Sequence, residues 1–149
     1  MEENEIKEKI LKGAAELFLK YGVRSITMDE IARHLGISKK TLYKYFTDKD
    51  DIVATGTLRH LEKERKELDE IATNSSNSVE ELVRLSYCVR ANLQGMNPSL
   101  LFDLQKYHQK AWKIWLDYKG NIIRNSVVRN LKKGIEDGLF REDMDPEVL

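Results

Sequence analysis

The sequence has 149 residues, enough for one good core or two small packed units, and 34% of them are charged. The 25 basic side chains are balanced by 25 acidic ones, which excludes an overall basic surface, so any nucleic-acid site must be a local patch. Cys88 is the only cysteine, no apolar run reaches the length of a membrane span, and the charged start MEENEIKEK is unlike a signal peptide; we therefore expect a cytoplasmic protein.

Few glycines and prolines interrupt the chain, and apolar residues recur at helical spacing, so the sequence predicts an all-α fold. The first helix is expected over about residues 5–21, ending in a left-handed cap at Gly22. The second begins at Thr27, because Thr27-Met28-Asp29-Glu30 has the pattern of a capping box, and ends at Gly36. The third is expected from the N-cap residue Ser38 to about Tyr45.

Four further helices are predicted beyond residue 46. The fourth begins at Thr47 or Asp48 and ends before the polar loop 74–77, and the fifth opens with a capping box at Ser78. Asn97-Pro98 predicts the start of a short sixth helix, and the seventh runs to about residue 137, where Gly138 caps it. The side chains expected to point inward are Leu82, Val83, Ser86, Val89 and Leu93 from the fifth helix, and Trp112, Trp115, Leu116, Ile122, Ile123, Val127, Leu131 and Ile135 from the seventh.

The second and third helices, joined by a tight turn at Gly36, have the organisation of a helix-turn-helix motif. Ala32 is small where the two helices are expected to cross closely, and Ile31, Leu35 and Leu42 join them into one body. Such rigidity is what a recognition helix needs to enter a major groove about 12 Å wide in a fixed register.

The exposed face of the third helix has the chemistry that a DNA groove requires. Residues 20–49 contain seven basic and three acidic residues, a local net charge of +4 in a neutral chain. Lysines neutralise phosphates or reach guanine edges, while hydroxyls donate hydrogen bonds to phosphate oxygens. The residues expected to contact DNA on these grounds are Ser38, Lys39, Lys40, Thr41, Tyr43, Lys44, Tyr45 and Lys49. For Tyr43 and Tyr45, packing against the first or fourth helix is the alternative.

The run ITMDEIARHLGISKKTLYKYFTDKDDIV, residues 26–53, resembles the DNA-binding segment of the TetR family of repressors, and the resemblance extends back to about Ile6. It implies a DNA contact for Thr27 in addition to those at Lys39, Thr41, Tyr43, Lys44, Tyr45 and Lys49. It also implies a three-helix DNA-binding domain over residues 1–47 and a helical ligand-sensing and dimerisation domain over 48–149, with the fourth helix as connector. Family members usually have two more helices, so this second domain is expected to be short at its C-terminus. A truncated chain, a naturally short form and dimerisation through the sixth and seventh helices all stay open.

Aromatic and sulfur-containing side chains are frequent between residues 79 and 131, which is typical both of a helical core and of a ligand pocket. The resemblance implies an inducer pocket among the fourth to seventh helices. The residues expected to line it are Tyr87, Met96, Phe102, Tyr107, Trp112, Trp115 and Tyr118.

The sequence therefore predicts a sequence-specific transcription regulator: a repressor that binds double-stranded, palindromic operator DNA as a homodimer and is released by a small-molecule inducer. We expect no cofactor, metal site or membrane partner. An enzyme is a poor alternative, because phosphate-binding motifs are missing and His34, His60 and His108 lie far apart in the sequence. The other alternative is a short protein-interaction module that sequesters a full-length regulator.

Overall fold

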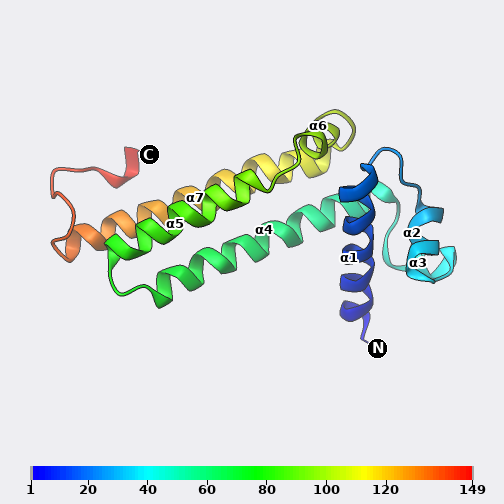
Figure 1. Ribbon diagram of the computed structural model, residues 1–149, viewed down its shortest axis with the longest axis horizontal. Helices are drawn as coiled ribbons and strands as arrows, with labels where there is room; N and C mark the ends of the chain where they lie inside the picture. Colours follow the sequence, from blue (N-terminus) through cyan, green and yellow to red (C-terminus); the bar gives the residue numbers. More distant parts are fainter. Residues whose placement is uncertain (1, 149) are drawn as a thin grey trace. The chain divides into compact units, whose positions relative to one another are not determined.

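The computed structural model describes residues 2–148, which form helices without a strand among them (Figure 1). This confirms the all-α class. The helices are α1 Glu3–Tyr21, α2 Met28–Leu35, α3 Lys39–Tyr45, α4 Lys49–Asn74, α5 Ser78–Gln94, α6 Pro98–Tyr107, α7 Gln109–Glu136 and the short 3-10 helix η1 Pro146–Val148. Within the described part, no helix is long and apolar enough to cross a membrane.

The chain divides into two compact units. Unit 1 contains Met1–Arg59 and Met96–Trp115, and unit 2 contains His60–Gly95 and Leu116–Leu149. This division differs from a simple break after residue 47, because α6 and the first part of α7 pack with the N-terminal helices.

The core of unit 1 is built from α1 to α4 and from the segment 96–115. Val23, Ile31 and Leu42 are completely buried, and Leu104 and Ala111 join the same cluster. Burial of this apolar area is the main force that holds the short helices α2 and α3 in place, because isolated helices of this length are unstable in water.

The apolar side chains of α6 and of the first part of α7 pack within unit 1. Leu104 is buried there, and Leu101 and Trp112 are partly buried against the same core. The two tryptophan rings stack face to face, with centroids 5.5 Å apart and planes 5° from parallel. The packing of α6 with the N-terminal helices differs from the expected sensing domain over residues 48–149, in which this helix was predicted to lie.

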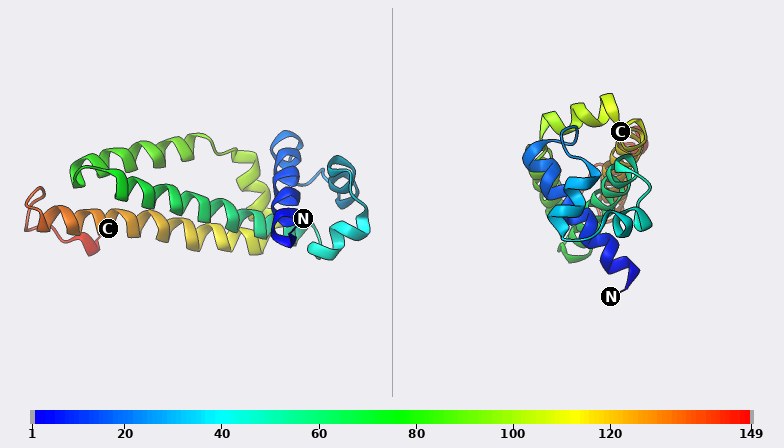
Figure 2. Two further views of the ribbon diagram at one scale, coloured as in Figure 1. Left: turned by 90° about the horizontal axis from the view of Figure 1, so that it is seen from below. Right: turned by 90° about the vertical axis from the view of Figure 1, so that its right-hand side faces the viewer.

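The helices of unit 2 are α5, residues 60–74 of α4 and residues 116–136 of α7. These three helical segments run side by side in both Figure 1 and Figure 2. Its buried apolar residues include Leu61, Leu68 and Leu85. Polar residues are unusually frequent in this interior: the buried set is Glu64, Ser78, Glu81, Lys119, Ser126 and Asn130.

Polar pairing explains why the inward face of α5 differs from the predicted one. Val83 and Leu93 are 49% and 52% exposed, and Ser86 is exposed as well, so these three predictions were wrong. Glu81 is buried instead, where its carboxylate accepts a hydrogen bond of 2.8 Å from the amide of Asn130. The buried side of α5 therefore includes Glu81 and differs from the side that its apolar residues alone predict.

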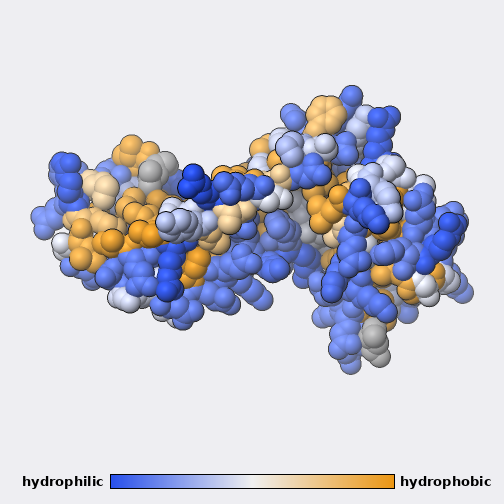
Figure 3. All heavy atoms as spheres, viewed as in Figure 1, coloured by the Kyte–Doolittle hydropathy of each residue, from blue (hydrophilic) through white to orange (hydrophobic). Residues whose placement is uncertain are grey.

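Leu116 is a second exception, because it is 50% exposed although it was expected to point inward from the seventh helix. Leu116 follows Trp115 at the point where α7 passes from unit 1 to unit 2. In the space-filling view, apolar atoms gather on the visible face of unit 2 (Figure 3), and the exposed apolar side chains of this unit include Val79, Val83, Leu116 and Leu139.

The caps of α4 and α5 fall at or beside the predicted starts, at Asp48 for α4 and at Asn77 for α5. At α4, the side chain of Asp48 accepts from the amide of Asp51 at 2.8 Å, and Asp51 accepts from the amide of Thr47 at 3.0 Å. At α5, Asn77 is the N-cap residue in place of Ser78 and accepts from the amide of Glu80 at 2.9 Å.

Candidate DNA-binding interface

The two helices of the helix-turn-helix motif begin at the predicted caps. Thr27 accepts from the amide of Glu30 at 3.2 Å, and its hydroxyl donates to the Glu30 carboxylate at 3.3 Å. Ser38 accepts from the amide of Thr41 at 3.0 Å and shares a hydroxyl–hydroxyl hydrogen bond of 2.9 Å with it. Both capping side chains are thus held in place before any contact with DNA.

The turn between the helices requires glycine. Gly36 has φ +68° and ψ 31°, a left-handed conformation that side chains with a β-carbon disfavour. The amide of the next residue, Ile37, then bonds to the carbonyl of Ala32 at 3.0 Å, which closes the end of α2. Gly22 also has a positive φ, +87°, but its ψ of 156° lies outside the left-handed helical region predicted for it.

The outward face of α3 is basic and phenolic. Leu42 is completely buried, as predicted, and Phe46 is 3% exposed, so the opposite side of the helix faces solvent. Lys40 and Lys44 are four residues apart on that exposed side, and Tyr43 beside them is 47% exposed. These three side chains form an accessible row with two positive charges.

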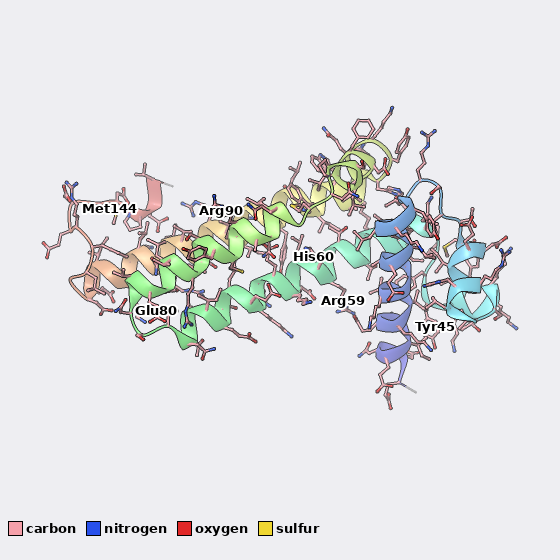
Figure 4. All side chains as sticks on the ribbon, in the orientation of Figure 1. Tyr45, Arg59, His60, Glu80, Arg90 and Met144 are labelled. Atoms are coloured by element: carbon pink, nitrogen blue, oxygen red, sulfur yellow. The ribbon has the colours of Figure 1, made fainter. Side chains whose placement is uncertain are left out.

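Tyr45 and Lys39 flank this row and have partners within the protein. Tyr45, labelled in Figure 4 at the end of α3, is partly buried against the core of unit 1, with the ammonium of Lys44 5.5 Å from its ring centre. The ammonium of Lys39 lies 2.9 Å from the carboxylate of Asp29, and this hydrogen bond raises the pKa of Lys39. Lys40, Tyr43 and Lys44 are all exposed on the outward face of α3.

The ammonium of Lys49 points to the loop that precedes α2. It donates to the carbonyls of Val23 and Ile26 at 3.0 Å each and to that of Arg24 at 3.4 Å. Burial lowers the pKa of Lys49, because desolvation disfavours its charged form. An ammonium has three N–H donors, and these carbonyls match that number. The sequence predicted a phosphate contact here and gave no sign of this internal role.

The seven residues predicted to line an inducer pocket are distributed over both units. Met96, Phe102, Tyr107, Trp112 and Trp115 belong to unit 1, whereas Tyr87 and Tyr118 belong to unit 2. Tyr87 is 66% exposed and Phe102 is 57% exposed, while Tyr107 lies under the guanidinium of Arg24, 4.8 Å from ring centre to Cζ. Within the residues that the structure describes, no three His, Cys, Asp or Glu side chains gather as ligands for a metal ion.

Comparison with known proteins identifies the segment that contains the helix-turn-helix. Residues 10–55 match the family model of bacterial regulatory proteins, tetR family. An uncharacterized HTH-type transcriptional regulator of Bacillus subtilis, YvaF, is 34% identical over 89 residues, and the chain spans 47% of its length. The HTH-type transcriptional repressor KstR2 of Mycobacterium tuberculosis is 24% identical over 98% of this chain and 74% of its own.

Solved structures show the same fold over nearly the whole chain. The transcriptional regulator FadR from Bacillus subtilis, crystallised in complex with stearoyl-CoA, superposes with a TM-score of 0.67 at 20% identity, over 95% of this chain and 77% of FadR. The proteins compared are described as transcriptional regulators, and the alternative of a sequestering interaction module finds no support among them. The helix-turn-helix segment of this chain thus matches the tetR family of bacterial regulatory proteins, and its helical fold is that of solved transcriptional regulators.

Proposed function

We propose that this protein is a sequence-specific repressor that binds operator DNA through α3. The observation that carries the proposal is the row of Lys40, Tyr43 and Lys44, which is exposed on a helix fixed by a buried core and by the side-chain cap at Ser38. Ammonium groups can donate hydrogen bonds to phosphates and to guanine edges, and the phenol can donate one to a phosphate oxygen. The residues proposed to touch DNA are Thr27, Ser38, Lys39, Lys40, Thr41, Tyr43, Lys44 and Tyr45.

Lys49 has a different role in this proposal. Its three carbonyl partners lie in the loop that leads directly to the cap residue Thr27. We infer that Lys49 supports DNA binding by fixing this loop, and that it acts through the position of α2 without itself meeting a phosphate.

The operator is proposed to be palindromic and the active form a homodimer. A single helix-turn-helix offers few base contacts, and two of them reach successive major grooves when they are about 34 Å apart or a multiple of it. A pair of identical heads related by a two-fold axis reads a sequence with the same symmetry.

A small molecule is proposed to release the repressor. FadR was crystallised with stearoyl-CoA, a precedent for a small-molecule ligand on this fold. The route to DNA in this chain would be α4, whose residues 49–59 belong to unit 1 and whose residues 60–74 belong to unit 2. At its start, α4 contacts the DNA-binding head through Lys49, so a shift of α4 would move the head.

The test is selection of bound duplexes from a random pool, followed by affinity measurements on the selected site. Tyr43→Ala and Lys44→Ala should each weaken binding by about 1–3 kcal/mol, with nearly unchanged thermal stability, because both side chains are exposed. Lys63→Ala, an exposed lysine of α4 in unit 2, is the matched control and should leave binding unchanged. Failure to select any duplex, or unfolding by Tyr43→Ala, would contradict the proposed interface.

A further inference from the structure

An open cleft of about 480 Å³ lies along the C-terminal half of α7, within unit 2. Its lining is mostly charged, with four basic side chains against two acidic ones, and only Val128 adds a buried apolar floor. The lining residues are Arg124, Asn125, Val128, Arg129, Lys132, Lys133, Glu136 and Glu147. The volume falls within the range of small-molecule sites.

One of the two acidic groups in the cleft comes from the chain that follows α7. After Gly138 the backbone turns back, and Figure 1 shows the C-terminal segment returning alongside α7. Glu147 of η1 extends its carboxylate to the ammonium of Lys132 and to the guanidinium of Arg124, which is 3.4 Å away. Arg124 also donates to the backbone carbonyl of Glu147 at 3.1 Å.

In these contacts, two basic side chains of the cleft already bind one carboxylate. A guanidinium and an ammonium converge on a single carboxylate, and this combination is the usual one for carboxylate and phosphate recognition. Without Glu147, the lining would hold four basic residues and only Glu136 as an acid. Arg129 is already paired with the carboxylate of Asp69, at 3.1 Å, so part of its charge is neutralised.

The segment that supplies Glu147 is held lightly. Helix η1 has three residues and buries none of them, and the side chain of Glu147 is 53% exposed. Exposed ion pairs of this kind contribute little free energy each, so a competing anion has only a small interaction to displace.

We propose that the α7 cleft is an anion-binding site for a small carboxylate- or phosphate-bearing molecule, and that Glu147 occupies it as an exchangeable internal ligand. Lys132 and Arg124 are the anchoring residues, and Lys133 provides a further positive charge for a second acidic group. The ligand displaces the segment 145–148 from α7. The proposal does not depend on the DNA-binding function, because every residue that carries it lies in unit 2.

The test is titration of the full chain with pyrophosphate and, separately, with citrate at constant ionic strength, followed by calorimetry and by amide NMR. We expect saturable binding, with the largest shifts in residues 124–133 and 145–148. Glu147→Gln should tighten binding roughly threefold or more, because it removes the internal competitor. Binding of pyrophosphate alone would identify a phosphate site, binding of citrate alone a carboxylate site, and each result supports the proposal.

Two matched variants separate a built site from a general charge effect. Glu142→Gln makes the same charge change in the chain between α7 and the segment 145–148, outside the cleft, and should leave both titrations unchanged. Lys132→Gln, added to Glu147→Gln, should remove the gain. Absence of saturable binding by both anions, or equal tightening by Glu142→Gln and Glu147→Gln, would overturn the proposal. Operator binding by the same variants reports separately on the proposed function.

Discussion

Gly13 of α1 lies directly against the side chain of Leu35 at the end of α2. A β-carbon placed on Gly13 would be 2.4 Å from Cδ2 and 3.1 Å from Cγ of Leu35, closer than atoms in contact normally approach. Gly13 is itself buried. The two helices can therefore cross this tightly only because residue 13 has no side chain, and the crossing fixes α2 immediately before the turn at Gly36.

Gly13→Ala should displace Leu35 and with it the helix-turn-helix. Overpacking costs roughly 1–3 kcal/mol, against about 1 kcal/mol gained by alanine over glycine inside a helix, so stability should fall slightly or stay level. DNA affinity should fall more than stability, because α2 moves. Gly120→Ala is the control: no atom lies within 4 Å of its added β-carbon, so it should stabilise the protein. Denaturant unfolding measures the stability, and operator titration measures the DNA affinity. Unchanged DNA affinity for Gly13→Ala would refute the inference that the tight crossing of α1 and α2 fixes the helix-turn-helix.

Lys49→Met distinguishes an internal role from a phosphate contact. Removing the ammonium leaves the carbonyls of Val23, Arg24 and Ile26 without this donor, which should cost about 1–3 kcal/mol of stability. Operator affinity should fall, while its dependence on salt keeps its slope. A phosphate contact predicts the reverse: unchanged stability and a slope reduced by about one unit. Lys40→Met, at an exposed position, provides that second pattern as a reference.

The helix-turn-helix was predictable because its local signals agree. Caps at Thr27 and Ser38, a glycine at the turn and an apolar side through Leu42 act over a few residues, and each is found where the sequence placed it. The close approach of α1 to α2 could not be predicted, because Gly13 is brought to Leu35 only by tertiary packing.

The inward faces of the helices in unit 2 were less predictable, because pairing between polar residues far apart in the sequence determines which side chains are buried. An apolar stripe gives the inward face of a helix when the core is apolar, but Glu81 is buried through its bond to Asn130, 49 residues away. Neither residue signals its partner in the sequence. The same applies to Lys49, whose surroundings in the sequence are those of an exposed lysine at a helix start.

Acid should release the segment that contains Glu147. Its hydrogen bond and charge interaction with Lys132, and then those with Arg124, lower the pKa of Glu147 below its ordinary value of 4.5. The folded-state pKa is thus below the unfolded one, so the contribution of this contact is complete above pH 4.5 and is lost as pH falls through the folded value. Amide exchange of residues 145–148 should rise in that range. Lys132→Gln should move the transition to higher pH, and a transition that stays in place would contradict the assignment.

The buried pair of Glu64 and Lys119 should dominate the stability of unit 2. The Lys119 ammonium lies 3.0 and 3.1 Å from the two carboxylate oxygens of Glu64, and the two side chains are 7% and 2% exposed. Asn92 donates to the same carboxylate at 3.2 Å. Lys119→Met leaves a charge buried beside an amide that cannot neutralise it, which should cost about 3–5 kcal/mol.

The double variant Glu64→Leu, Lys119→Met should recover much of that loss, because replacing both members of a buried ion pair by apolar groups removes their desolvation cost as well as their attraction. Denaturant unfolding of the single and double variants gives the coupling free energy directly. Lys113→Met, at an exposed position of the same helix, is the control and should change stability by less than about 0.5 kcal/mol. If the losses of the two single variants simply add in the double variant, then the two charges do not stabilise one another, and the polar interior of unit 2 needs another explanation.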